Sequence, residues 1–101
     1  MIMKVYHRDS LPHPLDLNHC RNPGWPRLYT HVADVEASGL EEAFRLTNSL
    51  ERPWWENEEI TLKTEPPLRR TSVGDVIVDG GGPKLCLAVG WRDLQKETKV
   101  T

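Results

Sequence analysis

One helical segment, between Ser38 and Arg52, lies between two groups of strand-like residues and limits what this chain can fold into. Its apolar positions recur at helical spacing, at Leu40, Ala43, Phe44, Thr47 and Leu50, with Leu46 on the flank. Ser38 and Glu41 have the spacing of a capping box, and Pro53 ends the helix at or before Arg52. A helix with one apolar face needs a partner surface, which in this sequence only a sheet can supply.

The remaining regular segments have the composition of β-strands. Alternating or β-branched residues predict strands at residues 2–7, 28–36, 59–64, 75–78 and 84–91. The glycine-rich residues 79–83 favour a hairpin between the last two strands. The expected order is β-β-α-β-β-β. This order indicates an α+β fold, with one helix packed on a mostly antiparallel sheet of about five strands.

The length and composition predict a single domain that spans residues 1–101. The chain has 101 residues, of which 38% are hydrophobic, enough for one modest core. Four prolines and a glycine interrupt residues 9–27, so we expect a Pro-rich loop there that is mobile or functional. The polar tail at 93–101 is expected to fray.

No apolar run approaches the roughly 18 residues that a membrane span requires, so no membrane contact is expected. The first residues are charged too early for a signal peptide, which indicates a cytoplasmic protein. Cys20 and Cys86 are far apart in the sequence and are expected to be free thiols in a reducing compartment.

Residues with catalytic or metal-binding chemistry form no recognisable pattern. The spacing of His13, His19 and Cys20 within the Pro-rich loop matches no zinc site. Cys86 lies within an apolar strand, which should raise the pKa of its thiol and make it inert. The sequence therefore predicts no catalytic residue, no metal and no cofactor, and favours a protein that is not an enzyme.

The first candidate for binding follows the helix, at Trp54, Trp55 and Asn57. Adjacent tryptophans do not easily point the same way, so we expect one to cap the core and the other to be exposed, as at interface hot spots. The alternative is that both pack under the loop.

The second candidate for binding is the group Arg69, Arg70, Ser72 and Asp75, which precedes an apolar strand. Two arginines before a tight turn could clamp a phosphate or a carboxylate. They could equally be solvated charges at a strand edge that prevent association between sheets. The segment from Ser72 to Asp75 is also typical of a turn that starts a strand.

The same segment resembles the YodL-like family of small bacterial, phage and plasmid proteins. The resemblance rests on Arg70-Thr71-Ser72-Val73-Gly74-Asp75-Val76-Ile77-Val78, with a return through Val89-Gly90-Trp91. Residues 9–27 have no counterpart in it. Such proteins are mostly of unknown function, and some similar domains accompany antirestriction and mobile-element proteins. The resemblance therefore implies a role in binding or interference rather than in catalysis.

Together these observations favour a binding module for a protein partner, of the mobile-element or anti-defence type. The alternative is a nucleic-acid-binding module that uses Arg69, Arg70, Lys84 and an exposed tryptophan stacked on bases. The formal net charge of -2 disfavours nucleic acid as the partner. A third possibility is a small hydrolase or nuclease that uses His31 or His7 with an acidic residue.

Overall fold

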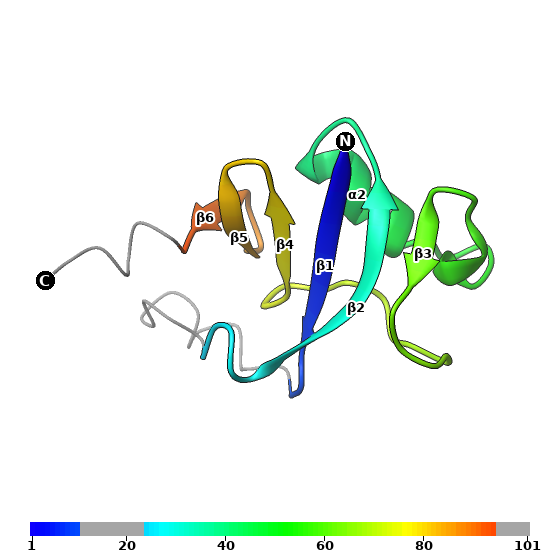
Figure 1. Cartoon of the computed structure of the whole chain (residues 1–101), viewed down its shortest axis with the longest axis horizontal. Coiled ribbons are helices and arrows are strands. Elements are labelled where there is room, and N and C mark those ends of the chain that lie inside the picture. The colour runs from blue at the N-terminus through cyan, green and yellow to red at the C-terminus, as the bar shows by residue number, and fades with distance from the viewer. Residues whose placement is uncertain (11–23, 95–101) are drawn as a thin grey trace, which may run out of the picture.

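An antiparallel sheet of six strands, with one α-helix on one face, makes up the part of the chain that the computed structural model describes, residues 1–10 and 24–94. Along the sheet the strands are ordered β3-β2-β1-β4-β5-β6 (Figure 1). Their bounds are β1 Ile2–Arg8, β2 Tyr29–Glu36, β3 Ile60–Leu62, β4 Val76–Asp79, β5 Gly82–Cys86 and β6 Trp91–Asp93. Helix α2 spans Leu40–Thr47, and a 3₁₀ turn, η1, spans Trp54–Glu56. The structure confirms the predicted single-domain α+β fold.

Strand β1 lies inside the sheet, between β2 and β4. Val5 pairs with Ala33, but the next residue, Tyr6, pairs with His31. Val32 is therefore an extra residue in β2, which is the pattern of a β-bulge. Because the bulge interrupts the alternation of side chains, Val32 and Ala33 are both buried although they are consecutive in the strand.

The sheet has a hydrophobic cluster on each face. The first cluster packs under α2 and η1 and includes Met3, Val5, Ala33, Val35, Ala43, Leu46, Trp54 and Ile77. The second lies on the opposite face and consists of Tyr29, Val76, Leu85 and Leu94, with Tyr6 and Trp25 packed against it. Consecutive residues of β4, Val76 and Ile77, belong to different clusters because side chains alternate along a strand. The central strands are thus buried on both faces.

The helix α2 ends before Arg52, as Pro53 predicted, but its start lacks the predicted capping box and its apolar face stops short of Leu50. The N-cap residue is Gly39, with no side-chain cap. In place of the capping box, the backbone N–H of Ser38 donates to the Glu42 carboxylate over 2.8 Å. The helix ends at Thr47, because the neighbouring segment binds it there: the backbone N–H of Thr71 donates to the Thr47 carbonyl over 3.0 Å. Leu50, predicted to lie on the apolar face, is 78% exposed.

The predicted strand at 84–91 is two strands in the structure. Residues 87–90 form a turn closed by a hydrogen bond from the Leu87 N–H to the Gly90 carbonyl, and Gly90 adopts a φ of 77°, which favours glycine. Trp91 then begins β6, the edge strand, opposite Cys86. β6 extends to Asp93 and Leu94 is fully buried, so the expected tail does not begin at residue 93.

Only the ends of the expected Pro-rich loop lie within the described residues. The chain turns between Gly24 and Leu28, where the Leu28 N–H donates to the Gly24 carbonyl over 2.9 Å. His13, His19 and Cys20 lie outside the described residues, as does the segment 95–101. Across residues 1–10 and 24–94, no helix is both long enough and apolar enough to span a membrane.

Candidate functional site

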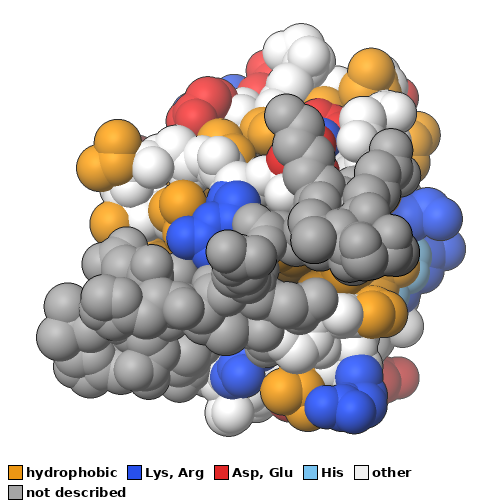
Figure 2. All heavy atoms as spheres, turned by 90° about the vertical axis from the view of Figure 1, so that its left-hand side faces the viewer, with side chains coloured by type: hydrophobic (Ala, Val, Ile, Leu, Met, Phe, Trp, Pro, Cys, Tyr) orange, Lys and Arg blue, Asp and Glu red, His pale blue; other side chains and the backbone are white. Residues whose placement is uncertain are grey.

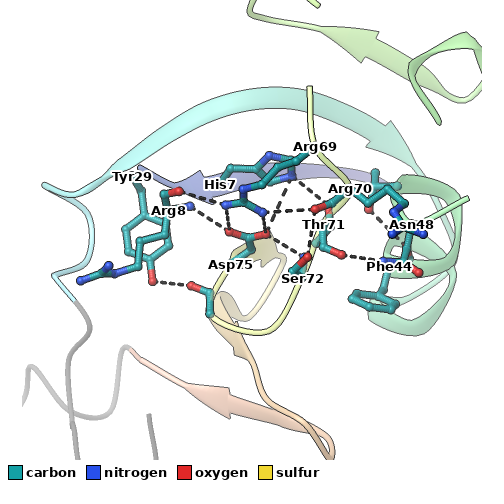
Figure 3. Close-up of polar contacts among 12 residues, drawn as sticks. His7, Arg8, Tyr29, Phe44, Asn48, Arg69, Arg70, Thr71, Ser72 and Asp75 are labelled. Carbon is teal, nitrogen blue, oxygen red and sulfur yellow. Dashed lines mark hydrogen bonds and ion pairs between the residues drawn. The ribbon is translucent and has the colours of Figure 1, made fainter. Parts of the chain in front are cut away.

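Asp75 lies immediately before β4 and is fully buried. Its carboxylate accepts two hydrogen bonds from the Arg69 guanidinium, Nη1 to Oδ2 over 2.6 Å and Nη2 to Oδ1 over 2.7 Å (Figure 3). The backbone N–H groups of Arg8 and Ser72 donate to the same two oxygens over 2.8 Å and 2.7 Å. An ionised carboxylate accepts about four hydrogen bonds. Asp75 is thus saturated by partners within the protein.

The Arg69 guanidinium has further partners inside the protein. Its Nη2 donates to the Arg8 carbonyl over 2.9 Å, and its Nη1 donates to the Arg70 carbonyl over 3.1 Å. The indole N–H of Trp54 donates to the Arg69 carbonyl over 3.0 Å. Arg69 thereby joins the end of β1, the 3₁₀ turn η1 and the start of β4. This geometry explains why an arginine precedes the turn at residues 72–75.

His7 is buried beside this pair. Its Nε2 lies 3.0 Å from the Thr71 hydroxyl and 4.0 Å from the Asp75 carboxylate, and its ring packs edge-on against Trp54. Burial lowers the pKa of His7 to about 4, although Asp75 opposes the change, and Arg69 lowers the pKa further. His7 is therefore neutral at pH 7. Thr71 is fully buried, so its hydroxyl is not presented to a substrate in solution.

The adjacent residues Trp54 and Trp55 lie in different environments. Trp54 is 1% exposed and belongs to the core under α2, as expected for one of the two. Trp55 is half-buried, and the rings of the pair lie 5.7 Å apart at an angle of 82°. The side-chain amide of Asn57 donates to the Leu46 carbonyl over 3.0 Å. Asn57 therefore fixes the segment that follows α2.

Of the seven predicted binding residues, the structure brings four into one network, Trp54, Arg69, Ser72 and Asp75. Figure 3 shows the Arg69 guanidinium and the backbone of Ser72 directed at the Asp75 carboxylate, and the Trp54 indole N–H donates to the Arg69 carbonyl. Arg70 is exposed, and its carbonyl accepts hydrogen bonds from the Arg69 guanidinium and the Ser72 hydroxyl. A binding role for these residues remains a prediction; Arg69 and Arg70 are exposed, whereas Trp55, Asn57 and Ser72 are half-buried.

Two of the basic side chains named for nucleic-acid binding pair with acidic groups at different places in the fold. Lys84 pairs with Asp79 in the β4–β5 hairpin over 3.1 Å, whereas Arg69 pairs with Asp75 near the end of β1. On the face shown in Figure 2, the visible Lys and Arg side chains lie in several separate groups. A basic patch or stripe is the usual electrostatic footprint of a nucleic-acid-binding protein, so these separate ion pairs favour the protein-binding alternative.

A second site lies between α2 and the β5–β6 turn. We call this cavity of about 180 Å³ the α2–β6 cleft; its lining consists of Glu41, Phe44, Val73, Cys86, Leu87, Ala88, Gly90 and Trp91. The rings of Phe44 and Trp91 lie 6.3 Å apart and nearly perpendicular. The Trp91 indole N–H donates to the Glu41 carboxylate over 3.0 Å. Among the described residues, the lining of the cleft is therefore mainly apolar, and Glu41 is its one charged group.

The cleft lies at the margin of the area of the sheet that α2 covers. Figure 1 shows α2 behind the central strands, while β5 and β6 extend beyond it. A wider groove of about 800 Å³ continues along α2 and shares Glu41 and Phe44 with the cleft. At the wall of the cleft, burial together with the charges of Asp75 and Glu41 raises the pKa of the Cys86 thiol to about 12. The structure thus supports the expected inertness of this cysteine.

Sequence reasoning did not identify this second site. Glu41 was expected to cap the helix, Phe44 to lie on its apolar face and Trp91 to end a strand. Glu41 and Phe44 are three residues apart on a helix, so their proximity could have been inferred. Their contact with Trp91, about 50 residues later in the chain, depends on the position of β6 beside α2.

Within residues 1–10 and 24–94, no group of three or more His, Cys, Asp or Glu side chains is placed to hold a metal ion. No protein-family model matches the chain, and comparisons with curated proteins and with solved structures found no significant match.

Proposed function

We propose that this protein is a cytoplasmic binding module that acts by recognising another protein and not by catalysis. The observation that supports the proposal is the α2–β6 cleft, where apolar and aromatic side chains remain accessible beside the turn at residues 87–90. Val89 at this turn is 90% exposed, and Ala88 and Gly90 are also exposed. Aromatic side chains in accessible clefts are typical anchors of protein interfaces.

The resemblance to YodL-like proteins agrees with this proposal, because it implies binding or interference in the context of mobile elements or antirestriction. The saturated hydrogen bonding around Asp75 also favours the cleft over the Arg69 segment as the contact surface. A side chain whose donors and acceptors already have internal partners has little left to offer a ligand.

Site-specific photo-crosslinking tests the proposal. A benzophenone amino acid at Val89 should give a discrete adduct in extract of the source cells, and mass spectrometry should identify a protein in it. The matched control places the same group at Thr61, which is exposed on β3 at the opposite edge of the sheet. The adduct from position 89 should decrease when Phe44→Ala removes one wall of the cleft.

If position 89 gives no adduct over a range of salt concentrations, the proposal is wrong. It is equally wrong if positions 89 and 61 give the same adducts, because the cleft would then have no special role.

A further inference from the structure

The charge in the α2–β6 cleft comes from Glu41, the only ionised side chain among the described residues that line it. One oxygen of its carboxylate accepts the Trp91 indole N–H over 3.0 Å, which holds the group beside the aromatic wall. Arg45, the cation on the same helix, lies 3.7 Å from Glu42. Within residues 1–10 and 24–94, Glu41 has no cationic partner within ion-pair distance, so a ligand could supply one.

The size of the cleft indicates what kind of group it can hold. Pockets for drug-sized ligands have volumes of about 300–1,000 Å³, whereas this cavity has a volume of about 180 Å³. It therefore suits one long side chain of a larger partner. Lysine and arginine place an aliphatic stem along apolar surface while the charged end stays at a polar group. Their aliphatic stems also pack well against aromatic rings, and Phe44 and Trp91 supply such rings in the lining.

Other side chains fit this lining less well. A purely aliphatic side chain would cover the Glu41 carboxylate and remove water from it without replacing the lost hydrogen bonds. An acidic side chain would be repelled by the same carboxylate. The adjoining groove has the same preference, because among the described residues Glu41, Glu42 and Glu51 line it and Arg45 is its one cation.

We propose that the α2–β6 cleft binds a lysine or arginine side chain of the partner protein, with its stem packed against the lining formed by Phe44 and Trp91 and its cationic end at Glu41. This inference rests on the proposed function, since it names the chemistry of the partner at the same site. It implies that the partner presents a basic residue flanked by aliphatic ones. The groove along α2 would favour a second basic residue nearby.

The test uses two blocked tripeptides, leucine-lysine-leucine and leucine-norleucine-leucine, which differ in the ammonium group. Each is titrated up to about 20 mM, a range suited to millimolar affinities, into the ¹⁵N-labelled full chain. The Trp91 indole N–H resonance is the readout, because this group donates directly to Glu41; its assignment comes from Trp91→Phe. We expect the lysine peptide to bind about fivefold more tightly than the norleucine peptide.

Glu41→Gln removes the charge but keeps an oxygen that can accept from Trp91, so it should make the two affinities equal within about twofold. Glu42→Gln, the matched control one residue along the helix, should keep the preference for lysine. The inference is overturned if neither peptide moves the Trp91 resonance, if both bind equally to the unmodified protein, or if Glu41→Gln keeps the preference. A position-specific adduct at Val89 in any of these cases would leave the protein-binding proposal intact.

Discussion

At the scale of single residues, the Asp75 carboxylate accepts four hydrogen bonds from groups within the protein. It is fully buried and accepts hydrogen bonds from one guanidinium and two backbone N–H groups. A buried charge is tolerated only when it is paired and hydrogen-bonded. The pair with Arg69 therefore holds β1 and β4 in place, and loss of either partner should affect folding before it affects binding.

We expect Asp75→Asn to lower the free energy of unfolding by about 3 kcal/mol, because it leaves the Arg69 guanidinium without its counter-charge and some donors without an acceptor. Urea denaturation followed by circular dichroism measures the change. Asp79→Asn is the control: it alters the ion pair with Lys84 at the hairpin, and should cost less than about 1 kcal/mol. Equal midpoints for Asp75→Asn and the unmodified protein would contradict a structural role for Asp75.

The buried imidazole of His7 should make stability depend on pH. Its pKa is about 4 in the folded protein and about 6.5 when unfolded, so between these values the unfolded chain binds more protons. Stability is then fully present above pH 6.5 and decreases as the pH falls towards 4, by up to about 1.4 kcal/mol per pH unit and about 3 kcal/mol in total.

Urea midpoints measured between pH 4 and pH 7.5 check this expectation. Carboxylates also titrate at the low end, so the comparison is with His7→Gln, which should have a shallower slope between pH 6.5 and pH 4. Tyr6→Phe, a change to the neighbouring residue, should keep the slope of the unmodified protein. The expectation fails if His7→Gln and the unmodified protein have parallel profiles.

At the scale of elements, β6 is a short edge strand that anchors the end of the sheet. Leu94, directly after it, is fully buried in the second cluster with Val76 and Leu85. Its N–H donates to the Pro83 carbonyl over 3.1 Å. The position of β6 also places Trp91 beside α2, so the cleft depends on this anchor.

Leu94→Ala should lower the free energy of unfolding by about 2–4 kcal/mol, because it removes buried methyl groups and leaves a cavity. Leu50→Ala, at a residue that is 78% exposed, is the matched control and should change stability by no more than about 0.5 kcal/mol. Chemical denaturation distinguishes them. If the two variants had the same stability, Leu94 would not be part of the core.

At the scale of the whole molecule, two hydrophobic clusters share the central strands of one sheet. Val5 and Ile77 face α2, while their neighbours Tyr6 and Val76 belong to the opposite side. Because the same strands carry the side chains of both clusters, disruption of one cluster also displaces the strands on which the other cluster packs. The molecule should therefore unfold as one cooperative unit.

In urea, two probes should report the same midpoint. In a Trp25→Phe variant, the tryptophan fluorescence comes from Trp54, Trp55 and Trp91, which pack on the α2 side. The methyl resonances of Leu94 report the opposite cluster. Separate midpoints would show that the two faces unfold independently.

Local pattern was enough to predict most of the elements. The apolar spacing from Leu40 predicted α2, and the β-branched runs predicted β1, β2 and β4, because these signals depend on side chains close together in the chain. The pattern failed where contacts from elsewhere decided the outcome. The hydrogen bond from Thr71 at the end of α2 and the turn at Gly90 within the expected last strand are examples.

The amino-acid sequence by itself determined the class of fold: one amphipathic helix, several strands and a glycine-rich hairpin leave few other arrangements. Only the tertiary structure decided what the notable residues do. It paired Arg69 with Asp75 inside the protein, and it placed Glu41 and Phe44 beside Trp91. The reason is physical: burial and pairing of charges depend on distances between segments far apart in the chain, which periodicity and composition do not encode.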